Sequence, residues 1–176
     1  MGESIVFWIH LLAASTWVGS QVFMFAAVVP ALRALGDETA RRRAVAVLNR
    51  RFAWLGWGAL VVLVLTGINN VIQRQRHYDI VFDYDHFYAW LFVAKLALVA
   101  LVFTLTAIHS YVLGPRLLAL QESGQAGAAG LGRMRRLSIQ LSVLNLLAGV
   151  AILFLVALLQ DQKFSFHRVE LSFPKI

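Results

Sequence analysis

Four residues near the N-terminus carry side chains that could hold a cofactor and share one face of a predicted helix. His10 is followed by Trp17, Gln21 and Met24 after 7, 11 and 14 residues, spacings that return to the same side of a helix. A buried imidazole can tie helices together by hydrogen bonding. It is also a common axial ligand of haem iron. The face therefore indicates either a helix-joining histidine or a cofactor site.

A lysine and a second histidine lie on one face of a later apolar segment. Lys95 interrupts an otherwise uncharged run, where a charge costs about 2.5–3.5 kcal/mol and usually faces protein or water. Its ammonium group could pair with a propionate, a carboxylate substrate or a helix carbonyl. His109 follows 14 residues later. Both are candidate cofactor residues, with His109 as a second metal ligand beside His10.

The elements that must position these residues are four apolar stretches. A helix of about 20 residues crosses a hydrocarbon core, and the stretches cover about residues 5–30, 52–72, 87–113 and 137–160. The chain is 60% hydrophobic and 14% charged, which is too apolar for a soluble domain of 176 residues. We therefore predict an all-α integral membrane protein, a four-transmembrane-helix bundle forming one domain, with residues 161–176 as an interfacial tail.

Basic residues are divided unequally between the two ends of these spans. Five arginines and lysines follow the second and fourth spans, whereas ten arginines follow the first and third. The positive-inside rule then places both termini outside, on the periplasmic side of an inner (cytoplasmic) membrane in a bacterial cell. The net charge of +7 forms no continuous basic face, so we expect a lipid bilayer and no nucleic acid as partner. The ten are Arg33, Arg41, Arg42, Arg43, Arg50, Arg51, Arg116, Arg133, Arg135 and Arg136.

The connecting segments carry local signals. Asp37 is placed to cap a helix over residues 38–51. The glycine- and alanine-rich stretch 124–132 predicts a flexible loop.

No cysteine is present, which excludes thiolate ligands and disulfides. The sequence shows no internal repeat. Ser138, Ser142, Asn145 and Gly149 form a polar and small stripe on the fourth span, typical of close helix packing.

Depth in the membrane predicts an outer site. The first and third spans both run inward from the outside, so His10 lies roughly 9 Å and Lys95 roughly 13 Å below their outer ends. His86 lies at the outer boundary of the third span. These three residues could therefore surround one cofactor.

His109 belongs to a different depth. It lies roughly 20 Å deeper than Lys95 along the third span, which excludes one cofactor bridged by His10 and His109. It predicts a second, inner site, where Arg51 and Arg116 are available for anionic groups.

Short motifs in three of the spans resemble known families. They are Ile9–Ala14, Trp17–Gly19 with Pro30, Arg51-Phe52 leading to Leu65–Gly67, and Trp90 through Lys95–Val99 to His109. The first two spans resemble those of copper-resistance-D-type (CopD-like) membrane proteins, and the third is similar to HemJ-type protoporphyrinogen oxidases. The resemblance implies a four-helix core with His10 and Lys95 as functional positions, and its HemJ side implies haem b. The chain departs from the HemJ pattern after the first-helix glycine, where a Pro-Arg-Leu run is replaced. In this chain the segment Val29–Leu32 stands in place of that run.

Our leading hypothesis from the sequence is a haem b protein, with one or two haems, in electron transfer or in oxidation of a membrane-soluble substrate. A quinone or a porphyrinogen would be such a substrate, and the sequence does not decide whether the protein is an enzyme. One alternative is CopD-like copper transport through His10 and Met24. Another is a small non-catalytic subunit of a larger redox complex, or a homo-oligomer. The candidate metal ligands are His10 and His109, and the other cofactor contacts are Trp17, Gln21, Arg51, His86 and Lys95.

Overall fold

The computed structural model describes residues 2–73, 87–123 and 128–161, and every element in these ranges is helical. Four helical stretches are long and apolar enough to cross a membrane: Ser4–Ala34, Glu38–Ile72, Phe87–Leu117 and Gly130–Gln160. The predicted all-α architecture with four spans is confirmed. His86 and residues 162–176 of the predicted interfacial tail lie outside the described residues, so the predictions for them are unchanged.

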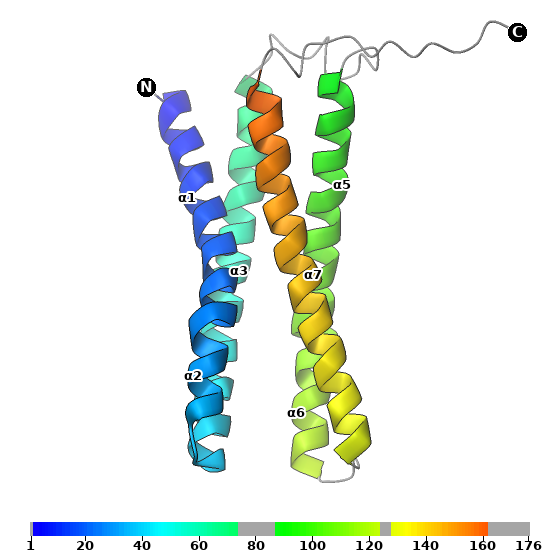
Figure 1. The fold of residues 1–176 in the computed structure, drawn as a ribbon. Coiled ribbons are helices and arrows are strands. Elements are labelled where there is room, and N and C mark those ends of the chain that lie inside the picture. Colours follow the sequence, from blue (N-terminus) through cyan, green and yellow to red (C-terminus); the bar gives the residue numbers. More distant parts are fainter. Residues whose placement is uncertain (1, 74–86, 124–127, 162–176) are drawn as a thin grey trace, which may run out of the picture. The chain divides into compact units, whose positions relative to one another are not determined.

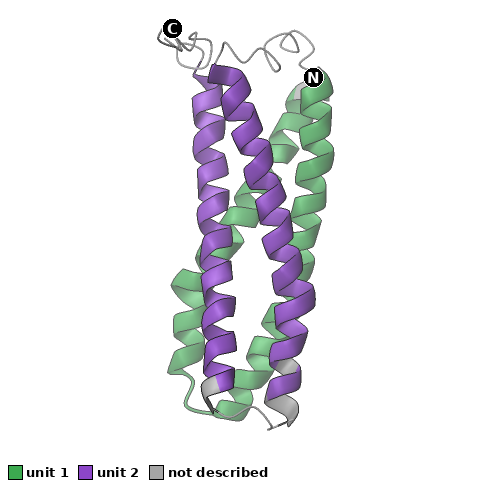
Figure 2. Ribbon diagram, turned by 90° about the vertical axis from the view of Figure 1, so that its right-hand side faces the viewer, with its two compact units in different colours: residues 1–75 green, residues 76–176 purple. Residues whose placement is uncertain are grey.

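The chain divides into two compact units, residues 1–75 and 76–176, which Figure 2 colours separately. In the first, α1 (Gly2–Phe23), η1 (Met24–Val28) and α2 (Val29–Ala34) follow one another along a rod that packs beside α3 (Glu38–Gln73). In the second, α5 (Phe87–Ala107), η3 (Ile108–Leu113) and α6 (Gly114–Ser123) form the rod beside α7 (Ala128–Gln160). Each unit is thus a helical hairpin (Figure 1).

Each hairpin buries a narrow seam of apolar side chains that includes several alanines. In the first unit the seam includes Ala13 and Trp17 of α1 and Ala59 and Leu60 of α3. Small residues let two helix backbones approach closely, which is how helices pack in lipid. Many other large apolar side chains in both hairpins are exposed, as expected for surfaces that contact acyl chains.

Both rods contain a short π-helix immediately before a proline. The N–H of Val29 donates to the carbonyl of Met24, and the N–H of Gly114 donates to the carbonyl of His109. Proline lacks an N–H and its ring crowds the carbonyl four residues earlier. The wider π turn relieves this crowding and lets the helix continue. The rods run on to Ala34 and Ser123, beyond residues 30 and 113, where the predicted first and third spans end.

The two rods repeat one construction at an offset of 85 residues, a repeat that the sequence alone did not reveal. Pro30 and Pro115 are each the second residue of the helix after the π segment. The π hydrogen bonds coincide at the same offset. Residues at equivalent positions differ in type, which hides the repeat from inspection of the sequence. The chemically relevant equivalents are His10 with Lys95, Gln21 with Thr106, and Met24 with His109.

The connecting segments confirm one local prediction and correct another. The Asp37 carboxylate accepts hydrogen bonds from the N–H groups of Thr39 and Ala40, at 2.8 and 3.3 Å, and so caps α3. The predicted flexible loop over residues 124–132 is wrong for residues 128–132, which open α7. Two glycines there cost about 1 kcal/mol each, but the long apolar helix that follows propagates the helical turn through them.

Candidate functional site

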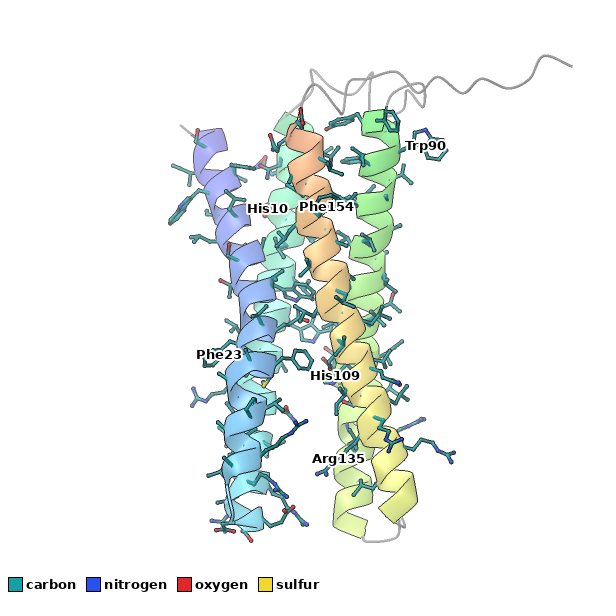
Figure 3. All side chains as sticks on the ribbon, viewed as in Figure 1. His10, Phe23, Trp90, His109, Arg135 and Phe154 are labelled. Atoms are coloured by element: carbon teal, nitrogen blue, oxygen red, sulfur yellow. The ribbon has the colours of Figure 1, made fainter. Side chains whose placement is uncertain are left out.

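His10 lies between α1 and α3 and contacts the second helix of its own hairpin (Figure 3). Its Nδ1 atom is 2.7 Å from the hydroxyl oxygen of Thr66, a residue 56 positions later. Both side chains are half-buried. This close contact between the imidazole and the hydroxyl fixes the His10 ring against α3.

The Thr66 hydroxyl also decides which nitrogen of His10 carries the proton. Its oxygen lies 2.6 Å from the backbone carbonyl of Val62, which can only accept, so the hydroxyl proton is donated there. The same oxygen must then accept from His10, and Nδ1 is the protonated nitrogen. The lone pair of the neutral ring consequently lies on Nε2. This is the arrangement in which a metal-ligating histidine is held by its other nitrogen.

Gly67 provides the space in which the His10 ring sits. A Cβ atom added at Gly67 would lie 3.5 Å from Cε1 of His10, which is ordinary van der Waals contact. A methyl group would therefore just touch the ring, and any larger side chain would occupy its place. Thr66 and Gly67 together form a seat for the imidazole on α3.

The other residues of the His10 face have different surroundings. Trp17 is buried in the seam of the hairpin, with 5% of its surface exposed. The Gln21 amide donates to the backbone carbonyl of Trp17 at 3.3 Å, so it bonds within its own helix. Met24 opens the π segment and is half-buried. Of the predicted face, His10 is the member that reaches across to a polar group of α3.

The second unit contains a separate polar contact around His109. This residue lies in η3 (Figure 3), where Nε2 is 3.1 Å from the hydroxyl of Ser138 on α7. Ser142 donates to the carbonyl of Ser138 at 2.9 Å, and Asn145 donates to the hydroxyl of Thr106 at 3.3 Å. Hydrogen bonds of this kind hold membrane helices together.

The polar stripe on α7 therefore packs as the sequence predicted. Ser138 and Asn145 bond to the facing rod, and Ala148 and Gly149 are buried beside it. The side-chain amide oxygen of Asn145, Oδ1, is buried without a hydrogen-bond partner among the described residues. The stripe joins α7 to α5 and η3.

The remaining candidates lie at other positions of the two hairpins. Lys95 is half-buried on α5, at the position that His10 holds on the first rod. Arg51 and Arg116 are exposed on α3 and α6. His10 belongs to the first unit and Lys95 to the second, so the outer site shared by His10, His86 and Lys95 stays a prediction.

Thr66 and Gly67 are the site residues that the search for chemical groups overlooked. Sequence inspection used them as part of a family motif and assigned them no contact with His10. A polar residue followed by glycine in the middle of an uncharged span was the available signal. Such a pair creates a close approach and a hydrogen bond at one position of the helix.

Comparison with protein-family models shows to which family the chain belongs. The family model described as copper resistance protein D (CopD) matches residues 46–159, about two thirds of the chain. The chain belongs to the CopD family. The match covers Thr66, Gly67, Lys95 and His109, while His10 precedes it. No curated protein and no solved structure matches the chain.

Membership of the CopD family, together with the four apolar spans, makes this a multi-pass membrane protein of a copper-resistance-related family in contact with lipid. The family resemblance inferred from the motifs is confirmed for CopD, and its HemJ side stays a prediction. Within the described ranges, no group of three or more histidine, cysteine, aspartate or glutamate side chains is arranged to hold a metal ion.

Proposed function

We propose that this CopD-family protein is a membrane haem b protein in which Nε2 of His10 ligates the iron. The observation that carries the proposal is the chain of hydrogen bonds from His10 Nδ1 to Thr66 and on to the Val62 carbonyl. It presents Nε2 as the ligand atom and orients the ring from behind, which is the usual support of a ligating histidine.

The number of available donors favours haem over a bare copper ion. A porphyrin brings four nitrogen ligands of its own, so one or two protein side chains complete the iron. A copper ion held by protein alone needs a cluster of soft donors or imidazoles. The described residues contain no cluster of three histidine, cysteine or acidic ligands. His10 and Met24 are 14 residues apart, about 21 Å along the rod, and cannot share one ion.

The remaining candidates take supporting roles in this proposal. Bound haem would supply a one-electron redox centre within the membrane. Lys95 would bind an anionic group, such as a propionate or a carboxylate, because a lysine within a span requires a polar partner. His109 would hold η3 against α7 through Ser138. Electron transfer or oxidation of a membrane-soluble substrate is the function that these parts support.

Copper transport is the second candidate, and the family match is the observation that favours it. In that case copper would be the cargo, and His10 and Met24 would be successive stations along one rod. Copper uptake that depends on both residues in a chain without haem would support this candidate.

The test is a measurement of metal and haem in the full-length protein, purified in detergent from cells supplied with copper and a haem precursor. We expect about one haem b per chain by pyridine haemochromogen assay, with matching iron and no stoichiometric copper. His10→Ala should lose the haem. His109→Ala is the matched control, since it removes an imidazole from the membrane without touching the His10 seat. Copper without haem in the wild type would overturn the proposal.

A further inference from the structure

One face of α3 presents arginine, tryptophan and aliphatic side chains in succession. We call this set the α3 stripe: Arg43, Val47, Arg50, Trp54, Val61, Leu65 and Ile68. Successive members are separated by 3, 4 or 7 residues, so they follow one side of the helix. All are exposed, and Trp54 is 76% exposed. Ala59, Leu60 and Thr66, which pack toward α1, lie on other sides of the helix.

The two arginines of the α3 stripe keep their charge available. Arg41 and Arg42 both bond to the carboxylate of Glu38, with the Arg42 contact at 3.1 Å. Arg43 and Arg50 form no ion pair with any described residue. The helix thus carries two arginines that share one carboxylate and, on a different face, two arginines that can bind an external anion.

The positions of these side chains along the helix match the layers of one membrane leaflet. The uncharged span begins at Phe52, so Trp54 lies about 3 Å inside the apolar region, close to the interface that tryptophan favours. Arg50 lies about 6 Å above it and Arg43 about 16 Å above it. Leu65 lies about 16 Å below it, close to half the thickness of a hydrocarbon core of about 30 Å.

We propose that the α3 stripe binds an anionic glycerophospholipid from the leaflet at this end of α3. Arg50 and Arg43 contact the phosphate and headgroup, Trp54 lies beside the glycerol, and an acyl chain follows Val61 and Leu65. The occupant is set by charge complementarity, because two unneutralised guanidinium groups above an apolar face match an anionic headgroup above acyl chains. A zwitterionic lipid offers the same chains but no net charge.

The experiment measures lipid binding to the full-length protein, delipidated in detergent, by native mass spectrometry with dioleoyl-phosphatidylglycerol or dioleoyl-phosphatidylcholine. We expect the wild type to bind phosphatidylglycerol more tightly. Each arginine near an anionic lipid surface raises the binding affinity about fivefold. The variant R43Q/R50Q should therefore lose about thirtyfold in affinity for phosphatidylglycerol and keep its affinity for phosphatidylcholine.

The matched control is R41Q/R42Q, which removes the same charge from the pair bound to Glu38 and should keep the preference. Trp54→Leu should lower the affinity for both lipids and keep the preference for phosphatidylglycerol. Equal losses in the two double variants would overturn the proposal, because net charge and not the stripe would then govern binding. Equal affinity of the wild type for both lipids would also overturn it. So would a dimer that excludes lipid, since a second copy would then occupy the face.

Discussion

At His10, one hydroxyl group determines which ring nitrogen can serve a metal. The sequence singled out this histidine because an imidazole on a membrane helix face is costly without a purpose. Its partner Thr66 could not be identified, since the two residues are 56 positions apart and only the packing of α1 on α3 brings them together. Residue type predicted the candidate ligand, whereas the supporting contact required the hairpin.

Substitution of Thr66 tests this supporting contact. Thr66→Val keeps the shape of the side chain but removes the acceptor for Nδ1, so the ring loses its orientation. Loss of such a supporting hydrogen bond lowers metal affinity by about 10- to 100-fold. We expect haem occupancy to fall during purification by a comparable factor, as read from the haem-to-protein absorbance ratio. Thr66→Ser should keep the haem, and equal losses in both variants would contradict the role of the hydroxyl.

Gly67 allows a graded test of the seat. Gly67→Ala places a methyl group 3.5 Å from Cε1 of His10, which the ring tolerates. Gly67→Leu fills the position of the ring and should displace it. Haem content should therefore be retained in the alanine variant and lost in the leucine variant, with the helical circular dichroism of both unchanged. Haem retained by Gly67→Leu would show that His10 binds in a different place.

Among the helices, the π segments are the features that sequence patterns did not predict. A proline in an apolar run ordinarily indicates the end of a helix, and the first span was predicted to end near Pro30. The structure instead widens one turn before each proline and carries the rod onward. Whether a helix ends or widens depends on the packing beyond the proline, which the second helix of the hairpin supplies.

Two glycines of the second unit, Gly114 after the π segment and Gly132 in α7, should respond in opposite ways to substitution by alanine. A Cβ at Gly114 would lie 3.3 Å from the carbonyl of His109, the acceptor of the π hydrogen bond. Gly114→Ala should destabilise the protein by about 1 kcal/mol. At Gly132 nothing lies within 4 Å, so Gly132→Ala should stabilise α7 by about 0.5–1 kcal/mol. Thermal unfolding in detergent measures both, and a stabilised Gly114→Ala would contradict the tight contact.

For the whole molecule, composition and span length predicted the architecture well. Four uncharged or nearly uncharged runs of this length predict helices, which satisfy their backbone hydrogen bonds within each segment as lipid requires, and the four spans are confirmed. The repeat of the two rods was missed because it resides in the backbone. His10 and Lys95, or Met24 and His109, occupy equivalent positions with different chemistry.

The orientation of the molecule is tested by single cysteines, because the native chain has none. The distribution of arginine predicts that the N-terminus lies outside and the turn between α2 and α3 inside. Ser4→Cys should react with a membrane-impermeant maleimide in spheroplasts. Gly36→Cys, exposed in that turn, should react only after the membrane is opened. The reverse pattern would contradict the predicted topology.

The most direct test of the central claim is the optical spectrum of His10→Gly purified with and without added imidazole. Removal of the side chain leaves a space in which free imidazole can replace the lost ligand. If Nε2 of His10 ligates the iron, the reduced-minus-oxidised haem b spectrum disappears in the variant and returns when imidazole is present during expression and purification. A haem b spectrum that the variant keeps unchanged without imidazole would contradict the claim, because the iron would then be held elsewhere.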